Sequence, residues 1–422
     1  MYIIMRGEKV MKALVLLELH FYRDDNGEYW SKRLIDYNYL DRYLSVFDKI
    51  NVCARISIID QTDGTLLKLS GPNVSFIELP DTQGVKETLK AFPETKKVFK
   101  ESLKTNDAVI VRAPSMMTML LYSEIKKSGL PFSVDVALSG LNMFPGKGVF
   151  NKFLNKRVDS YLKKICMQAN GVSYVTEYVL QQFYPCRAMC EPKNKDYFTG
   201  SFSTIEMNDE HYYKQDWDVK LKPDKFILVH SGFMDDSRKC QDHVIKVIKK
   251  VVDQGFNVEV RFIGDGGLRP KYEKMATEFG IQDRCVFCGL IRSKELLLKE
   301  LRKCHLFIFP TKAEGLPRSV LEAMAQGLPC ISSPVDGVPE LLRPEYLVNW
   351  WEVDGFAEKI CGLLSDWPRM VAQSDINYRK ALEYHNDILK GKRHDFYGKL
   401  YDLCRKNGKK DRCFKLRKDS NG

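Results

Sequence analysis

The chain has 422 residues, of which 44% are hydrophobic and 29% are charged, and its formal net charge is +11. This length is too great for one ordinary hydrophobic core and predicts two domains of about 200 residues each, while no apolar run approaches the ~18 residues that a membrane-spanning helix needs. Twelve cysteines are spread along the chain without the spacing of a disulfide framework, which favours reduced thiols over a secreted scaffold. We therefore expect a globular protein of the cytoplasm.

Apolar runs typical of buried strands alternate with helical patterns through the first half of the chain. Strands are expected at residues 12–17, 51–56, 74–79, 108–112, 132–138 and 171–175, with helices at 32–47, 85–103, 115–128 and 149–167. Alternation of this kind predicts a doubly wound α/β domain around a mostly parallel sheet. Residues 1–210 are accordingly interpreted as a first Rossmann-like domain.

Residues 149–167 are predicted to form a basic amphipathic helix. Its apolar stripe comprises Val149, Phe150, Phe153, Leu154, Val158, Tyr161, Leu162 and Ile165, and its remaining surface carries Lys152, Lys156, Arg157, Lys163 and Lys164. Such a helix can pack against its own sheet or lie on a membrane surface, and the sequence leaves both options open. The segment from Arg405 to Lys418 adds eight Lys or Arg residues against one acid, which is typical of a solvated terminus or of a contact with anionic lipid. Nothing else resembles a nucleic-acid-binding module, so no nucleic-acid partner is expected.

The second half of the chain repeats the α/β alternation. Residues 211–224 are polar and aromatic and are interpreted as a linker, residues 225–368 as a second Rossmann-like domain, residues 369–404 as a closing helix and residues 405–422 as a basic tail. Strands are expected at 226–230, 257–263 and 286–290. The turns that follow them contain glycines but no Gly-x-Gly-x-x-Gly fingerprint, which argues against a dinucleotide-dependent dehydrogenase.

The strongest functional signal is the stretch EGLPRSVLEAMAQGLPCISSPVDGVPE, which begins at Glu314. The apolar run at 305–310 predicts a buried strand that delivers Glu314 beyond its carboxyl end, where ligands bind in open parallel sheets. Ser319-x-x-Glu322 predicts a capping box at the start of a helix, and Gly327 is expected to end it. The free amides of the first turn and the helix dipole would form an anion site, flanked by two carboxylates.

The two glutamates, the first followed by Gly-Leu-Pro and the second by Ala-Met-Ala-x-Gly-Leu-Pro, resemble the signature of the retaining GT-B glycosyltransferases of family 4. The resemblance implies two Rossmann-like domains facing a cleft, with the C-terminal helix crossing back to the N-terminal domain. It also implies a nucleotide diphosphate sugar as the donor. Glu314 would then contact the transferred sugar, and Glu322 would hold the ribose hydroxyls.

The same resemblance implies further site residues. Lys239 matches the cation that the family places on the donor diphosphate, whereas Phe233 stands at the usual position of a second cation, for which Arg238 is the expected substitute. Asp135 lies where many members have a histidine close to the reacting sugar, and it is expected to contact donor or acceptor or else to solvate a strand end. The remaining donor-binding positions are turn and backbone positions: Gly27, Gly232, Gly264, Gly289, Leu290, Gly315, Leu316, Ser319 and Val320.

The expected function is therefore sugar transfer with retention of the anomeric configuration, from a nucleotide diphosphate sugar to an acceptor hydroxyl. A UDP-sugar is favoured over a GDP-sugar, and no cofactor or metal is expected, because no Asp-x-Asp pair stands at an interdomain edge. The expected acceptor is a glycan or lipid-linked glycan of capsule, exopolysaccharide or O-antigen synthesis, reached from the cytoplasm or from the inner face of the cell membrane. Two alternatives stay open: a catalytically silent GT-B binding subunit, which Phe233 and Cys240 favour, and a sugar-nucleotide 2-epimerase, which lacks such a glutamate pair.

Overall fold

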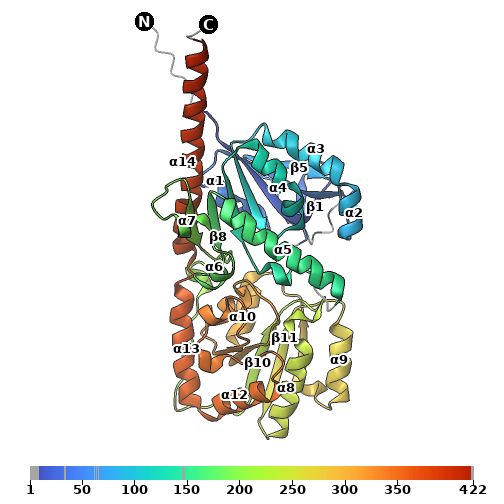
Figure 1. Cartoon of the computed structure of the whole chain (residues 1–422). Coiled ribbons are helices and arrows are strands. Elements are labelled where there is room, and N and C mark those ends of the chain that lie inside the picture. The colour runs from blue at the N-terminus through green and yellow to red at the C-terminus, as the bar shows by residue number, and fades with distance from the viewer. Residues whose placement is uncertain are drawn as a thin grey trace.

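The computed structural model describes residues 9–32, 35–60, 62, 64, 66–144 and 148–419, with the backbone alone at 142 and 408–419. Two α/β domains lie one above the other, and the last two helices run along one side of both (Figure 1). The expected pair of Rossmann-like domains is confirmed. Within the described ranges, none of the helices combines the length and the apolar character that a bilayer-spanning segment requires.

The first domain is built on a nine-stranded sheet. Seven strands pair in parallel in the order β5-β3-β1-β6-β7-β8-β9, and β2 and β4 extend the end of β1 in antiparallel pairing. The strands are β1 (Lys12–Arg23), β2 (Tyr29–Ser31), β3 (Lys49–Ile58), β4 (Leu67–Lys68), β5 (Val74–Leu79), β6 (Ala108–Ala113), β7 (Phe132–Val136), β8 (Gly171–Tyr174) and β9 (Phe198–Ser201).

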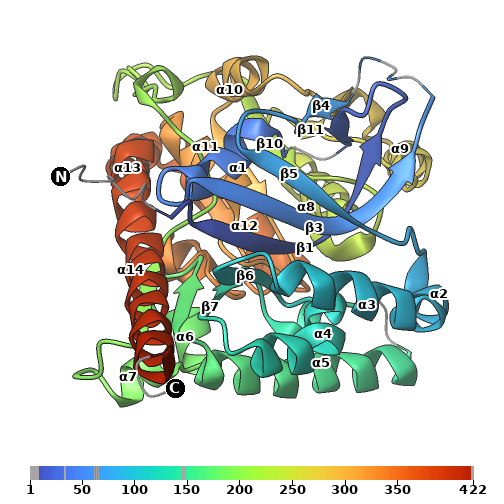
Figure 2. The same cartoon turned by 90° about the horizontal axis from the view of Figure 1, so that it is seen from above.

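Helices cover both faces of this sheet, because its central strands are apolar on both sides. In β1, Ala13 and Val15 belong to one buried cluster and Leu14 and Leu16 to another, as expected of a parallel strand buried on both faces. Helices α3, α4 and α5 lie on one face, and α1 lies with the C-terminal helix on the other (Figure 2). The helices of this domain are α1 (Tyr37–Leu44), α2 (Gly84–Lys90), α3 (Phe92–Leu103), α4 (Met116–Ser128), α5 (Val149–Gln168), α6 (Val179–Phe183) and α7 (Arg187–Cys190).

The second domain has a five-stranded parallel sheet in the order β12-β11-β10-β13-β14. Its strands are β10 (Phe226–Ser231), β11 (Val258–Ile263), β12 (Cys285–Gly289), β13 (Leu306–Phe309) and β14 (Cys330–Ser332), and its helices are α8 (Gln241–Asp253), α9 (Arg269–Glu278), α10 (Lys294–Arg302), α11 (Arg318–Ala325) and α12 (Val353–Ser365). Every residue of β13 is buried, so the expected buried strand ahead of Glu314 is confirmed.

The end of β1 differs from the sequence expectation. The first strand was expected to end at residue 17, but β1 continues to Arg23 and turns into β2, and Gly27 occupies that turn with a φ of +79°. The turn is closed by a 3.0 Å hydrogen bond from the Gly27 amide to the Asp24 carbonyl. Helix α1 then starts at Tyr37, where the side chain of Asp36 accepts from the Tyr39 amide, five residues later than expected.

The chain ends in two helices, α13 (Trp367–Leu382) and α14 (Asn386–Asp419), where one closing helix and a separate tail were expected. The break falls where the chain passes from one domain to the other, and there the Asn386 amide donates to the Met207 carbonyl at 2.7 Å. Helix α14 crosses back over the first domain and contacts α1 and β9, as the resemblance implied (Figures 1 and 2). It continues through the basic segment because Lys and Arg favour helix and no proline interrupts them.

A carboxylate of the second domain caps a helix of the first. Glu340 lies in the 3₁₀ turn Val338–Glu340 and is buried. Its side chain accepts from the backbone amides of Glu177, Tyr178 and Val179, at the start of α6, at 2.6, 3.0 and 2.8 Å. These amides would have no helical acceptor of their own, so the carboxylate satisfies them across the domain boundary.

We expect Glu340→Ala to lower the free energy of unfolding by about 1.5–3 kcal/mol, because it leaves buried amides without a charged acceptor. Urea denaturation measures this change. Glu345→Ala, at an exposed position of the same region, is the matched control and should stay within about 0.5 kcal/mol of the wild type. Equal stability of both variants would contradict the domain-capping role.

Candidate active site

A cavity of about 340 Å³ lies between the two domains, where strands of both sheets end. Its walls are formed by Arg112, Ala137, Val175 and Thr204 of the first domain and by Ser231, Gly232, Phe233, Lys239, Ile263, Gly264, Leu290, Ile291, Leu297, Glu314, Gly315, Leu316, Arg318, Ser319 and Glu322 of the second. Carboxyl ends of parallel strands are the usual ligand-binding edge of such sheets. The structure thus brings most of the predicted site residues into one cavity.

Glu314 is held in place by three partners in the loop that follows β13. Its carboxylate pairs with the Lys239 ammonium and accepts from the Thr311 hydroxyl at 2.9 Å. Its backbone amide donates to the Asp336 carboxylate at 2.7 Å. Because its side chain is only 9% exposed, the cation is needed to compensate for burial of the charge.

At the residue after Glu314, the backbones of the two domains lie close together. A Cβ atom on Gly315 would lie 1.9 Å from the carbonyl oxygen of Ala137, in the first domain. On its other side, the Gly315 carbonyl accepts from the Gly337 amide at 2.8 Å. Only a residue without a side chain fits between these backbones, so the predicted role of Gly315 in shaping the loop has a steric cause.

Glu322 projects into the cavity from α11, but the expected capping box is wrong. The helix begins at Arg318 with Pro317 as its N-cap, so Ser319 lies inside the first turn and caps nothing. Burial raises the pKa of Glu322, and the positive charges of Arg318 and Lys294 oppose this rise. The first amides of α11 have no intrahelical acceptor, which leaves the expected anion-binding character of this turn intact. Gly327, with a φ of +67°, follows the helix as expected.

Glycines at the ends of β10, β11 and β12 form the opposite wall. A Cβ on Gly264 would lie 2.2 Å from the Gly232 carbonyl oxygen, and the Gly264 amide donates to the Gly289 carbonyl at 2.8 Å. Gly232, Gly264 and Leu290 line the cavity, whereas Gly289 does not and reaches it only through its hydrogen bond from Gly264. The two glycines of the wall therefore bring backbone groups, rather than side chains, to the cavity.

Besides Gly289, four predicted site residues do not line the cavity. Gly27 is in the turn between β1 and β2, and Val320 is fully buried in α11. Arg238 is half-exposed and pairs with Asp236 at 2.7 Å. Asp135 faces a separate cavity of about 20 Å³, where it accepts from Ser173 at 2.6 Å and from Tyr397 of α14 at 2.9 Å. Burial raises the pKa of Asp135.

Sequence reasoning missed two cations of the cavity, Arg112 and Arg318. Arg112 ends the apolar run of β6 and pairs in register with Asp135 of the neighbouring strand β7. A charged residue at the end of a buried strand was the available signal for Arg112. Arg318 stands one turn before Glu322, and this spacing on an expected helix was the corresponding signal.

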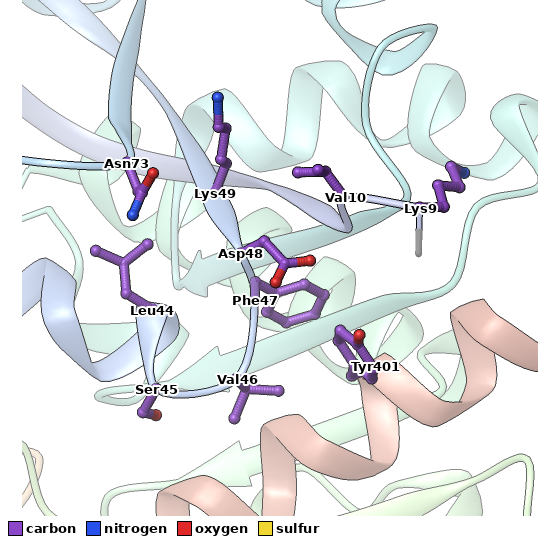
Figure 3. A pocket seen from close by; sticks show the side chains of 10 residues that line it. All are labelled: Lys9, Val10, Leu44, Ser45, Val46, Phe47, Asp48, Lys49, Asn73 and Tyr401. Carbon is purple, nitrogen blue, oxygen red and sulfur yellow. The ribbon is translucent and has the colours of Figure 1, made fainter. Parts of the chain in front are cut away.

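A second hollow, of about 630 Å³, lies at the other edge of the first domain (Figure 3). It is lined by Lys9, Val10, Leu44, Ser45, Val46, Phe47, Asp48, Lys49, Asn73 and Tyr401. Lys49 begins β3 and Asn73 precedes β5, so this hollow faces the amino ends of the strands. That edge is not where open α/β sheets bind ligands, and we assign the site to the interdomain cavity instead.

Asp336 makes a pH-dependent contribution to the stability of the fold around the site. It has a φ of +44°, and burial together with the negative charge of Glu314 raises its pKa from 3.8 to about 6. Between these two values the folded protein holds a proton that the unfolded chain has lost. The contribution of Asp336 to stability is therefore greatest at low pH and is lost as the pH rises through about 6.

Between pH 4.5 and pH 7, the free energy of unfolding of the wild type should fall by about 1–2 kcal/mol more than that of Asp336→Asn. Asparagine tolerates a positive φ and can still accept from the Glu314 amide, so the variant removes only the titration. Denaturation series at several pH values measure the difference. Asp354→Asn, exposed on α12, is the control and should follow the wild-type curve.

Comparison with known proteins agrees with this arrangement. Residues 225–366 match the family model described as "Glycosyl transferases group 1". Protein CapJ of Staphylococcus aureus is 28% identical over 308 residues, which are 73% of this chain and 75% of that protein. The Vi polysaccharide biosynthesis protein VipC/TviE of Salmonella typhi is 34% identical over 110 residues, 24% of this chain and 18% of its own length.

Among solved structures, Anabaena Alr3699/HepE in complex with UDP and glucose has a TM-score of 0.61 at 14% identity, and the match covers 90% of this chain and 97% of that one. At this identity the likeness shows the fold alone. The second domain thus matches group 1 of the glycosyl transferases, and the two-domain fold of the chain is that of the GT-B glycosyltransferases.

Proposed function

We propose that this protein is a retaining glycosyltransferase of family 4, which transfers a sugar from a nucleotide diphosphate sugar to an acceptor hydroxyl without a metal ion. The observation that carries the proposal is the convergence of Glu314, Lys239 and Glu322 on one interdomain cavity. The group 1 match of the second domain supports the reaction class.

The geometry suggests a separate role for each of these residues. Charge builds up on the leaving diphosphate as the glycosidic bond breaks, and the Lys239 ammonium and the first amides of α11 would stabilise it. Glu314, held by Lys239, Thr311 and Asp336, would orient the hydroxyls of the transferred sugar. Glu322 would accept from the ribose hydroxyls at the far end of the same cavity.

A UDP-sugar is the donor that we favour, and a polysaccharide precursor is the acceptor. The HepE structure, which shares the fold, holds UDP and glucose. The VipC/TviE relative is named for the biosynthesis of Vi polysaccharide, and its match covers 110 residues. We propose that the present chain builds a glycan of this kind on a lipid-linked acceptor.

Two glutamine variants separate the proposed roles. Glu322→Gln should weaken binding of UDP by about 10- to 100-fold, because a charged acceptor for the ribose hydroxyls is lost. Glu314→Gln should lower kcat by at least about 100-fold while the UDP affinity changes less than about 3-fold, because its contact matters most in the transition state. Calorimetry and product formation measure the two effects, and Glu358→Gln, exposed on α12, is the control.

The same assay tests the remaining parts of the proposal. NMR of the anomeric proton should show the donor configuration retained in the product, and turnover should persist in EDTA. An inverted product or loss of turnover on chelation would overturn the corresponding part. UDP binding without turnover on any glycan or lipid-linked acceptor would favour a silent binding subunit.

An exposed apolar tip on α5 supports a lipid-linked acceptor. The predicted stripe packs against the domain only from Asn155 onward, whereas Val149, Phe150 and Phe153 are 86%, 62% and 55% exposed. Lys152, Lys156 and Arg157 are exposed beside them. In Figure 1, α5 runs obliquely over the front of the first domain. We infer that this tip, with its basic rim, docks on an anionic membrane surface.

Replacing both Phe150 and Phe153 by Ser should reduce the fraction of protein that floats with phosphatidylglycerol vesicles by at least about 10-fold, since each buried aromatic contributes about 1.5–3 kcal/mol. Leu221→Ser, at an exposed apolar position of the linker, is the control. A chain truncated at Arg405 measures the separate share of the basic end of α14. Unchanged flotation of the double variant would remove α5 from the membrane proposal.

A further inference from the structure

Arg112 enters the interdomain cavity from the first domain. It lies near the carboxyl end of β6, and its half-buried side chain lines both this cavity and the small one that contains Asp135. Its guanidinium donates to the hydroxyl of Tyr39 on α1. A guanidinium has five N–H donors, so this bond leaves donors for a ligand in the cavity.

The second domain contributes two other cations to the cavity. Lys239 forms an ion pair with Glu314, whereas Arg318 is exposed and acts on Glu322 only through its positive charge. Arg238, the expected second cation of the donor site, pairs with Asp236 and does not line the cavity. Phe233 stands where the resemblance implied another cation, and its side chain is 53% exposed.

Arg112 differs from these residues in its surroundings. Its hydrogen-bond partner, Tyr39, offers a hydroxyl group rather than a carboxylate. The nearby carboxylate of Asp135 attracts Arg112 through its charge, but that carboxylate accepts its hydrogen bonds from Ser173 and Tyr397. The guanidinium therefore keeps hydrogen-bonding capacity for an anion on the cavity side.

We propose that Arg112 binds a phosphate group in the cavity and adds, from the first domain, a further cation to Lys239 and Arg318 of the second domain. This inference rests on the proposed function, because a nucleotide diphosphate sugar or a diphosphate-linked acceptor brings that phosphate. A guanidinium suits phosphate because its planar fork can donate two parallel hydrogen bonds. Since Lys239 and Arg112 belong to different domains, one bound diphosphate would connect the two domains.

The test compares Arg112→Gln, Arg112→Lys and the wild type in calorimetric titrations with UDP, UMP and geranyl diphosphate. If the donor supplies the phosphate, Arg112→Gln weakens UDP binding by about 10- to 100-fold and UMP binding by less than about 3-fold. If the acceptor supplies it, geranyl diphosphate loses affinity and UDP does not. The affinity of Arg112→Lys for the affected ligand should lie between those of the wild type and Arg112→Gln, because lysine keeps the charge but not the planar fork. Arg112→Lys also serves as the test variant if Arg112→Gln does not fold.

Arg187→Gln, in a surface ion pair on α7, is the matched control and should bind all three ligands like the wild type. Unchanged affinity of a folded Arg112 variant for both UDP and geranyl diphosphate overturns the inference. If Glu322→Gln still weakens UDP binding in that case, the proposed function stands and only the role of Arg112 fails. A wild type that binds neither diphosphate overturns both.

Discussion

The ion pair between Glu314 and Lys239 is the interaction on which the site depends. A carboxylate with so little exposure is costly to keep charged unless a cation and hydrogen-bond donors surround it, and Lys239, Thr311 and the local backbone provide them. The same loop carries Gly315, whose missing side chain lets it meet the Ala137 carbonyl of the first domain. One loop thus positions the Glu314 carboxylate and also brings the backbones of the two domains close together.

The fold was predictable wherever a local pattern determines structure. The apolar run of β13, the alternation of strands and helices, and Gly327 after α11 all follow from short-range chemistry. The capping box failed because Ser319 and Glu322 have the right spacing two positions too late: the N-cap is Pro317 and the helix starts at Arg318. The spacing alone does not say which residue is the N-cap, because the conformation of Pro317 decides it.

Contacts between distant parts of the chain explain why Asp135, one of the predicted site residues, does not line the interdomain cavity. Asp135 and Arg112 are register partners on neighbouring strands, so either one is a reasonable candidate at the sheet edge. Tyr397 of α14 donates a hydrogen bond to Asp135, and this contact places Asp135 in the small cavity of about 20 Å³. No local pattern in the first domain reports where α14 will pack. Phe47 and Tyr401, whose rings lie 5.7 Å apart, fix the same crossing helix further along.

The ion pairs of the cavity also determine at which residues a substitution has a single interpretation. Lys239 is both the nearest partner of Glu314 and the proposed ligand of the leaving diphosphate. Its removal would uncouple the carboxylate and weaken the phosphate site together, so a loss of activity would have two explanations. Glu322 and Arg112 each line the cavity without a side-chain contact to Glu314 among the hydrogen bonds and ion pairs of the described residues. Changes at these two positions therefore separate ligand binding from the positioning of Glu314, which Lys239 cannot do.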